Sequence, residues 1–446
     1  MKSIFFIIFL FPFLFSVVFA KDQIDTKQVK ETQNKPVKQE IKKKDNKVKL
    51  LNNGILTFVK DIRGSKINSP KSAIFSPDGK LFYVQALEGF ETLVFDASTY
   101  ELNKIIKHHF TEKNAYLFVT DEDTLFDYKY NTNINVNERN CFSGKPVESA
   151  FSHNGRFLWV SYYRRDWDKN SSNPSAIAII DTNTNEIVRV IPSGPIPKMI
   201  VPSPDGKKMA VIHWGDNSVG ILNIDFDDPS DFVWEKLLIS DKRLNLKGIS
   251  ENRDKQCGHC LRGAIFTKDS KYLFVGRMRS GGIIVFDIEN GNVLGILNKG
   301  EIFPRHFALS PNGQYLYVSS PKQGVIIEYE VDELLYILKQ ANGVAAFYKG
   351  LEIQIGAGVR TIALSNNGKY LYAACNADSK LVMVDIRNWK VISKINVAPY
   401  AVGLGINPTN DIIVVTSQGN GTDGGRVISI FKVNTDKLGK KLISDK

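Results

Sequence analysis

The stretch Ser310-Pro311-Asn312-Gly313-Gln314-Tyr315-Leu316-Tyr317-Val318 joins a tight turn to a β-strand. Proline suits the first central position of a turn, and Asn-Gly supplies the positive φ that follows. The aromatic and aliphatic residues after the turn are typical of a strand that packs against its neighbours. Turns of the same type lie between apolar runs at residues 76–80, 152–156, 203–207, 267–271 and 365–369, and in a weaker form at 407–410.

Each copy of the turn belongs to a longer repeat. One apolar strand precedes the turn and another follows it, and a third strand that ends in Asp and a fourth strand complete the unit. A period of roughly 40–50 residues with four short strands is the signature of a β-propeller blade. We therefore expect an all-β fold, a β-propeller of four-stranded blades, rather than the several smaller domains that 446 residues would suggest.

The number of blades depends on one interval. Seven turns predict a seven-bladed ring, but the interval from Ser76 to Ser152 is long enough for two blades. Within it, residues 116–119 and 124–128 have the composition of strands, so an eight-bladed ring is the alternative. We expect residues 54–59 to pair with 427–433 and close the ring, which would remove exposed sheet edges. Residues 333–340 have a short helical pattern.

Three tetrapeptides carry a family resemblance: Tyr-Val-Gln-Ala at 83–86, Tyr-Val-Ser-Ser at 317–320 and Tyr-Ala-Ala-Cys at 372–375. With the turns, they make residues 51–433 resemble the YVTN-type β-propeller repeat family. This resemblance implies seven blades but no single function, because such propellers serve many roles.

A second resemblance concerns one repeat. Residues 304–313 are similar to a repeat of the seven-bladed lactonase-like propellers. In that family, cationic and imidazole groups at the channel mouth serve sugar lactones, which makes His306 a catalytic candidate. Only this repeat has the Arg-His pair, and Glu148 is merely a nearby carboxylate, so catalysis by a lactonase-like hydrolase is an alternative function here.

The N-terminal segment indicates export. Residues 1–20 combine Lys2, an apolar stretch and the cleavage-type sequence Val18-Phe19-Ala20, as in a secretory signal peptide. The alternative is an uncleaved anchor, although the stretch is near the lower limit for spanning a bilayer. Residues 21–50 contain ten Lys, five acidic residues and no aromatic residue, which predicts a flexible linker before a propeller domain at 51–446. We expect an extracytoplasmic protein, located in a bacterial periplasm, secreted or in the cell envelope, without a transmembrane segment in the mature chain.

The formal net charge of +11 suggests an anionic partner. About half of that charge belongs to the linker, so the position of the remaining cations matters more than their number. The innermost strand of a blade leads from the top of the ring to the turn at the bottom. The residue five positions before each turn is therefore expected at the top mouth of the central channel.

Five of the seven repeats carry a cation at that position: Lys71, Lys198, Arg262, Arg305 and Arg360. The exceptions are Val147 and Val402, with Tyr400 close to the latter. Such a ring would form a positive funnel for carboxylates or phosphates. The alternative is that the long side chains cover apolar blade edges and leave their charges in water. Arg277 and His306 are expected on the same face.

Four cysteines, Cys141, Cys257, Cys260 and Cys375, are also expected on the top face. Export permits disulfides, and all four are candidates whose pairing stays open. Cys257-Gly258-His259-Cys260 is a CxxC motif that leads into a strand and is followed by no haem-binding His. A metal site formed by Cys257, Cys260 and His259 or His306, or a redox-active dithiol, is the alternative.

The sequence thus predicts an exported, non-catalytic propeller that binds an anionic ligand or a protein partner through its top face. The expected partner is an anionic small molecule or glycan, or another envelope protein, and no cofactor is expected. Nucleic acid is a possible partner, but no motif indicates it. The two alternatives are the lactonase-like hydrolase and a redox or metal-handling accessory protein that uses the CxxC motif.

Overall fold

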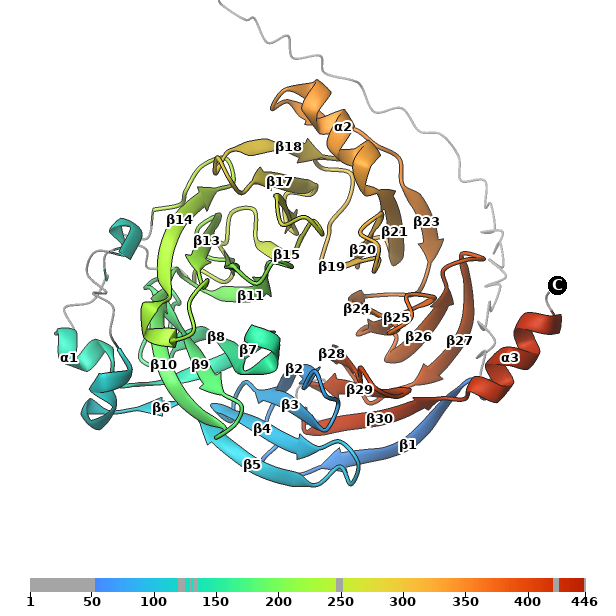
Figure 1. Cartoon of the computed structure of the whole chain (residues 1–446), viewed down its shortest axis with the longest axis horizontal. Helices are drawn as coiled ribbons and strands as arrows, with labels where there is room; N and C mark the ends of the chain where they lie inside the picture. The colour runs from blue at the N-terminus through green and yellow to red at the C-terminus, as the bar shows by residue number, and fades with distance from the viewer. Residues whose placement is uncertain are drawn as a thin grey trace, which may run out of the picture. The chain divides into compact units, whose positions relative to one another are not determined.

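The computed structural model describes residues 53–118, 125–128, 130, 135–245, 252–419 and 425–444. The predicted signal peptide and linker, residues 1–50, lie outside these residues. The described residues form seven antiparallel sheets around a central channel, which confirms the seven-bladed propeller (Figure 1).

The first three sheets, in chain order, are blades 1 to 3. Blade 1 contains β2 (Pro70–Phe75), β3 (Leu81–Ala86), β4 (Glu91–Asp96) and β5 (Leu102–Lys107). Blade 2 contains β7 (Phe142–Ser152), β8 (Phe157–Arg165), β9 (Ser175–Asp181) and β10 (Glu186–Ser193), and β6 (His109–Phe110) is added beside β7. Blade 3 contains β11 (Pro197–Pro202), β12 (Lys208–His213), β13 (Ser218–Asn223) and β14 (Val233–Ile239).

Blades 4 to 6 follow the same order. Blade 4 contains β15 (Leu261–Phe266), β16 (Tyr272–Arg277), β17 (Ile283–Asp287) and β18 (Val293–Leu297), with β22 (Ala345–Ala346) beside β18. Blade 5 contains β19 (His306–Leu309), β20 (Tyr315–Ser320), β21 (Val325–Glu330) and β23 (Leu351–Gln354). Blade 6 contains β24 (Val359–Leu364), β25 (Tyr370–Cys375), β26 (Lys380–Asp385) and β27 (Lys390–Asn396).

Blade 7 joins the two ends of the propeller. It contains β28 (Ala401–Ile406), β29 (Ile412–Ser417), β30 (Val427–Val433) and β1 (Leu56–Arg63), which comes from the start of the described chain. β1 pairs antiparallel with β30, with Leu56 opposite Val433, so the predicted closure is confirmed. This pairing covers an edge that the last blade would otherwise expose.

The predicted eighth blade is wrong. In the interval between blades 1 and 2, residues expected to form strands lie instead in short 3₁₀ helices, η1 (Glu112–Leu117) and η2 (Leu125–Asp127). Val119 and Thr124, which belonged to the same prediction, lie outside the described residues. Apolar character was misleading here because Leu117 packs on the outside of blade 2 in a cluster with Phe110 and Phe142, whereas Phe126 and Tyr128 pack against Trp234 of blade 3.

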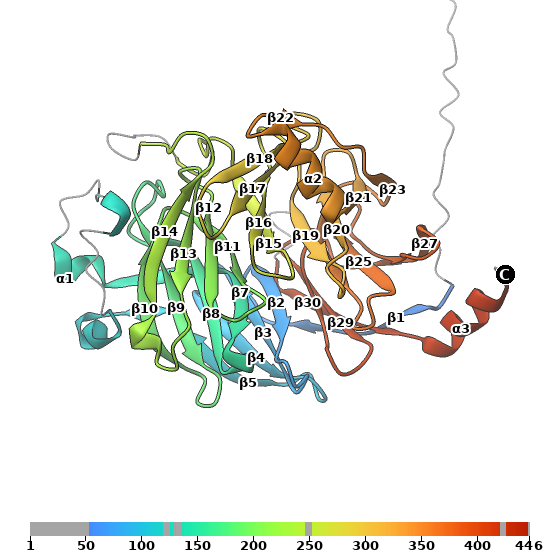
Figure 2. The ribbon, with the colours of Figure 1, turned by 45° about the horizontal axis from the view of Figure 1, so that its top comes forward.

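Four further helices of the described chain lie at the periphery: α1 (Val136–Arg139), α2 (Val331–Ala341), α3 (Thr435–Ser444) and η4 (Pro229–Asp231). The short helix η3 (His153–Gly155) is instead the turn that joins β7 to β8 in blade 2. α2 confirms the predicted helical pattern; it lies on the rim beside β18 and buries Leu334 and Leu338 (Figures 1 and 2). Within the described part of the chain, no helix has the length and apolar character needed to cross a membrane.

Local hydrogen bonds explain why one turn motif repeats. In blade 1 the Ser76 hydroxyl accepts a hydrogen bond from the backbone N–H of Leu81 at 3.0 Å, and Asp78 accepts one from the N–H of Lys80 at 3.1 Å. Gly79 takes a φ of 71°, a conformation that favours glycine. Ser310 and Asn312 repeat both contacts in blade 5. The motif therefore closes each hairpin at the bottom of the ring.

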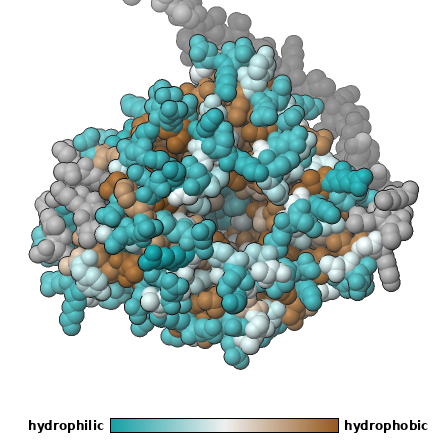
Figure 3. Space-filling view, viewed as in Figure 1, coloured by the Kyte–Doolittle hydropathy of each residue, from teal (hydrophilic) through white to brown (hydrophobic). Residues whose placement is uncertain are grey.

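The core lies between blades rather than inside one sheet. Central strands such as β9 are buried along almost their whole length, because both faces of a blade meet a neighbouring blade. Phe82 and Phe95 of blade 1, for example, stack at 4.8 Å and share a cluster with Val414 and Ile430 of blade 7. This packing fixes the innermost strands of all seven blades around the channel, whose mouth is the hollow near the centre of Figure 3.

Candidate functional site in the central channel

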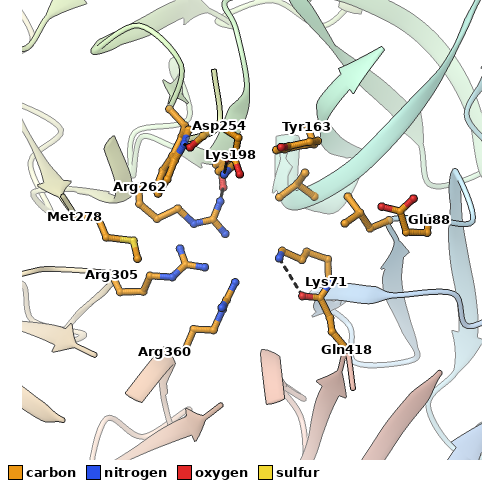
Figure 4. A pocket seen from close by; sticks show the side chains of 13 residues that line it. Lys71, Glu88, Tyr163, Lys198, Asp254, Arg262, Met278, Arg305, Arg360 and Gln418 are labelled. Atoms are coloured by element: carbon orange, nitrogen blue, oxygen red, sulfur yellow. Dashed lines mark hydrogen bonds and ion pairs between the residues drawn. The ribbon is translucent and has the colours of Figure 1, made fainter. Parts of the chain in front are cut away.

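The five predicted ring cations converge on one cavity of about 370 Å³ in the channel (Figure 4). Four of them lie on the innermost strands β2, β11, β15 and β24, and Arg305 directly precedes β19. Repetition of one position in the blade therefore places side chains that are far apart in sequence around a single space. The cations in this cavity are Lys71, Lys198, Arg262, Arg305 and Arg360.

The other lining residues come mainly from loops at the top of the ring. Loops that carry Tyr163, Trp214 and Met278 were expected on the top face, and Val147 was a ring position without a cation, but none of these residues was predicted to bind a ligand. Five of the lining residues, Leu87, Tyr163, Trp214, Met278 and Gln418, each follow the first residue of a turn by eleven positions. They therefore share a second repeated position of the blade, which the sequence prediction did not use. The additional lining residues are Leu87, Glu88, Val147, Tyr163, Trp214, Asp254, Met278 and Gln418.

Two of the five cations have acidic partners. Lys198 forms an ion pair with Asp254, and its ammonium nitrogen lies 3.9 Å from the centroid of the Trp214 ring. The Trp214 indole N–H donates to the backbone oxygen of Asp254 at 3.1 Å, which holds this loop over Lys198. Arg262 forms an ion pair with Glu148 and also donates to the backbone oxygen of Lys198. These two positive charges are locally compensated.

The other three cations have no acidic partner in the described part of the chain. Lys71 donates a hydrogen bond to the amide oxygen of Gln418 at 3.1 Å. The Arg360 guanidinium lies 5.9 Å from the centroid of the Tyr400 ring. Arg305 is 7% exposed, and no hydrogen bond or ion pair of its side chain is formed with any described residue. A buried guanidinium without an acceptor is costly, and the donors of Arg305 are unused among the described residues.

Crowding of like charges changes the acidity of these groups. Burial, followed by repulsion from Arg360, Arg262, Arg305 and Lys198, holds the pKa of Lys71 well below its usual value. Burial lowers the pKa of Lys198 to about 7, although Asp254 opposes the shift. Arginine stays protonated across the physiological range, so the guanidinium groups keep their charge. An anion in the cavity would relieve their mutual repulsion.

Below the ring, the channel contains a second cavity of about 400 Å³. Glu148 and His306, which directly follow the ring positions of blades 2 and 5, are among its lining residues. Burial, with repulsion from Arg305 and Arg262, lowers the pKa of His306 to about 3, so its imidazole is neutral near pH 7. The structure therefore places His306 beneath the ring cavity rather than among its lining side chains.

Two further predicted ligand residues lie away from the ring cavity. Arg277 is buried at the end of β16, where its guanidinium lies 3.0 Å from Nδ1 of His259, and the next residue, Met278, lines the cavity instead. Tyr400 is 37% exposed and does not line the cavity. Its ring centroid lies 5.9 Å from the Arg360 guanidinium, and its backbone oxygen accepts a hydrogen bond from the N–H of Gln418 at 3.0 Å. The prediction that top-face residues share one site was thus too broad for these two positions.

The structure contains one disulfide among the described residues, between Cys257 and Cys260 of the CxxC motif. It closes a short loop at residues 257–260, which follows Asp254 in the chain. In this form neither sulfur is a thiolate, and no group of three or more described His, Cys, Asp or Glu side chains is arranged to hold a metal. Cys375 is buried in blade 6, and burial raises the pKa of its thiol to about 12. No bond joins Cys141 to Cys375, so the second disulfide expected among the candidates is absent.

Comparison with known proteins gives one family match and one curated relative. Residues 258–335 match the family model "Lactonase, 7-bladed beta-propeller". Over 235 residues the chain is 27% identical to hydrazine synthase subunit beta from Kuenenia stuttgartiensis. That alignment covers 45% of this chain and 56% of the relative, so it spans little more than half of the relative's length.

Two solved structures share the architecture. The β-propeller domain of Cps50 (Swd1) from Myceliophteria thermophila has a TM-score of 0.59 at 14% identity, covering 85% of this chain and 100% of that domain. Kuenenia stuttgartiensis hydrazine synthase has a TM-score of 0.55 at 13% identity, covering 84% and 98%. At these identities the likeness shows the fold alone. The chain is a seven-bladed β-propeller similar to the lactonase-type propellers, as the repeats and the Arg305-His306 segment predicted.

Proposed function

We propose that this protein is a non-catalytic propeller that binds a small anionic ligand at the top mouth of its channel. The observation that carries the proposal is Arg305, a buried guanidinium directed into the cavity without a hydrogen-bond acceptor or counter-ion among the described residues (Figure 4). Guanidinium groups bind carboxylates and phosphates through paired hydrogen bonds.

The balance of charge in the cavity supports this function. Asp254 and Glu148 compensate Lys198 and Arg262, which leaves Arg305 and Arg360 as permanent positive charges without an acidic partner among the described side chains. Glu88 also lines the cavity, but its carboxylate accepts a hydrogen bond from Lys145 at 2.6 Å. An anion between Arg305 and Arg360 would supply the missing acceptors and lower the repulsion.

The shape of the site favours a small ligand or the end of a glycan chain. The cations surround one cavity of about 370 Å³ inside a ring rather than forming a long surface track. Nucleic-acid binding relies on many phosphate contacts along an extended backbone. The enclosed arrangement therefore supports recognition of a compact anion.

Isothermal titration tests this function with inorganic phosphate, sulfate, acetate and an acidic oligosaccharide. We expect at least one to bind, and Arg305→Ala or Arg360→Ala to weaken its binding roughly 10- to 100-fold, as expected for loss of a charge-assisted hydrogen bond. Lys80→Ala is the matched control, because it removes one positive charge from a side chain that is 81% exposed. Wild-type affinity in both arginine variants would contradict the proposal.

An extracytoplasmic location is part of the same proposal. Its support is the signal-type sequence at residues 1–20. Cell fractionation with N-terminal sequencing should find a mature chain that begins near Lys21 outside the cytoplasm. An intact N-terminus in the cytoplasmic fraction would exclude export.

Binding of an envelope protein is a second candidate function. Its support is the similarity to a protein named as the beta subunit of a synthase. Native mass spectrometry of the protein purified from its own cells should then show a complex of defined stoichiometry. If native mass spectrometry detects the protein as a monomer, both without small anions and with them, the result argues against this candidate.

A further inference from the structure

The amine of Lys71 differs from the other cations of the ring. Its one hydrogen bond to a described residue is to the neutral amide oxygen of Gln418, at 3.1 Å, and it forms no ion pair with any described carboxylate. Figure 4 shows it pointing into the cavity from the side opposite to Arg305 and Arg360. Lys71 therefore faces positive charge without a counter-ion.

These surroundings favour the uncharged form of the amine. Burial and four nearby cations, Lys198, Arg262, Arg305 and Arg360, all oppose protonation and hold the pKa of Lys71 well below its usual value. Desolvation and neighbouring cations are the surroundings that activate a lysine amine as a nucleophile. Arg305 and Arg360 keep their charge and remain able to bind a carboxylate.

We propose that Lys71 forms a Schiff base with the carbonyl group of a small oxo carboxylate whose carboxylate is held by Arg305 and Arg360. This inference rests on the proposed anion-binding function and adds the chemical class of the ligand. The cavity of about 370 Å³ accommodates such a molecule. A 2-oxo acid has the required arrangement, because its carbonyl carbon is bonded directly to the carboxylate that the arginines would hold.

The covalent step balances without an oxidant or a reductant. The amine nitrogen attacks the carbonyl carbon, and proton transfer from nitrogen to oxygen gives a carbinolamine. Loss of one water molecule then forms the carbon–nitrogen double bond. The reverse reaction with water releases the oxo acid and the free amine, so the site would hold its ligand reversibly.

Lys198 is the natural control within the same cavity. Its ammonium group is paired with Asp254 and lies against the rings of Trp214 and Tyr163. Asp254 favours the protonated form of Lys198, although burial still lowers its pKa to about 7. The ion pair with Asp254, which Lys71 lacks, is therefore what disfavours attack by Lys198. The two lysines thus share one cavity but differ in their counter-ions, which predicts that trapping occurs at Lys71.

Borohydride trapping tests the inference with the full chain. Pyruvate and sodium borohydride are added, and peptide mass spectrometry locates any reduced, irreversible adduct. We expect at least tenfold more adduct at Lys71 than at exposed lysines such as Lys80. We also expect the adduct to persist in Lys198→Arg, to disappear in Lys71→Arg and to decrease when excess lactate competes. Equal modification of exposed lysines and Lys71 would overturn the inference.

Lactate separates the two proposals, because it has the carboxylate but no carbonyl group. If calorimetry shows that lactate binds while pyruvate leaves Lys71 unmodified, the Schiff base is excluded and anion binding stands. If no carboxylate, phosphate or sulfate binds at all, both proposals fail. Trapping with the wild-type protein is enough to identify the modified lysine. The test therefore does not depend on whether Lys71→Arg folds.

Discussion

The carboxylate of Glu148 accepts a hydrogen bond from the guanidinium of Arg262, and the two residues come from different blades. Glu148 directly follows Val147, which occupies in blade 2 the position that carries a cation in five other blades. Blade 2 therefore contributes a counter-charge where those blades contribute positive charge. The pair neutralises Arg262 and leaves Arg305 and Arg360 as the arginines that an anion can bind.

Loss of the Glu148 carboxylate should have opposite effects on stability and binding. Glu148→Gln leaves the Arg262 side chain, which is 5% exposed, without its counter-ion. We expect the free energy of unfolding to fall by about 1–3 kcal/mol. This is less than the roughly 3–5 kcal/mol expected when a fully buried pair is broken, because Glu148 is partly exposed. Anion affinity should increase several-fold, since the cavity gains net positive charge. Urea denaturation and calorimetry measure the two effects.

Glu88→Gln is the matched control for this substitution. Glu88 also lines the cavity, but its side chain is 47% exposed and pairs with Lys145 at 2.6 Å. We expect the free energy of unfolding to change by at most about 1 kcal/mol, as for other solvent-exposed ion pairs. Equal destabilisation by both variants would show that the Glu148–Arg262 pair has no special role.

Anion affinity should depend on pH through Lys198. Its pKa is lowered to about 7 by burial and by Arg262 and Arg305, against the effect of Asp254. Lys198 loses its charge as pH rises through about 7, so sulfate should bind several-fold more weakly at pH 8.5 than at pH 6. Sulfate itself does not titrate in this range. Lys71 titrates in the same direction, and Lys198→Gln should therefore reduce the pH dependence without abolishing it.

The lowered pKa of Lys198 also makes the stability of the folded protein depend on pH. The folded state holds Lys198 with a pKa of about 7, whereas its usual value is 10.5. Between these values the unfolded chain binds more protons, so Lys198 makes the protein more stable as pH rises from about 7 towards 10. Urea denaturation at pH 7 and at pH 9 should show that the free energy of unfolding increases less in Lys198→Gln than in the wild type. An identical increase in both proteins would contradict the assignment.

A buried polar network attaches the segment between blades 1 and 2 to the ring. The Tyr128 hydroxyl donates to Asp216 at 2.7 Å, and the Ser218 hydroxyl donates to the other oxygen of the same carboxylate at 2.6 Å. Arg243 donates to Asp216 at 3.3 Å. We expect Tyr128→Phe to lower the free energy of unfolding by about 1 kcal/mol, because Asp216 keeps its other donors.

Asp216→Ala should be more damaging than Tyr128→Phe. It removes the acceptor shared by three side chains and leaves the Arg243 guanidinium without an acid, for which we expect a loss of roughly 3 kcal/mol. Urea denaturation of the two single variants and the double variant measures the coupling between the residues. Strictly additive effects would show that the Tyr128–Asp216 hydrogen bond contributes little.

The features that the sequence could predict are those that repeat. The Ser76–Asp78 turn is defined by hydrogen bonds within a few residues, so every copy in the sequence reports a hairpin. The position five residues before each turn can also be recognised in the sequence, because a fixed number of residues before the turn corresponds to a fixed height in the channel. Lys71 and Arg305 could therefore be assigned to one site without a structure.

The unpredicted features depend on contacts between segments rather than on the repeat alone. Asp254 reaches the cavity from a loop without a repeat register, whereas Gln418 stands at a repeated position, eleven residues after Asn407. The pairing of these two residues with Lys198 and Lys71 is visible only in three dimensions. Tyr128 was expected in a strand because aromatic residues favour strands. In the structure it is a buried hydrogen-bond donor, and tertiary contacts override that preference.

The catalytic alternative leads to the last prediction, which concerns His306. A general base works best when its pKa is near the working pH, whereas burial and two arginines lower the pKa of His306 to about 3. The nearby carboxylate of Glu148 is already paired with Arg262, so the part of the chain that the structure describes offers no free acid in the cavity below the ring to complete a catalytic pair with the imidazole. We therefore expect no turnover of a panel of sugar lactones, with or without divalent metal ions, when hydrolysis is followed by pH-stat titration. Turnover that His306→Ala abolishes but Arg277→Ala retains would instead establish a lactonase-like hydrolase, and the non-catalytic function would have to be abandoned.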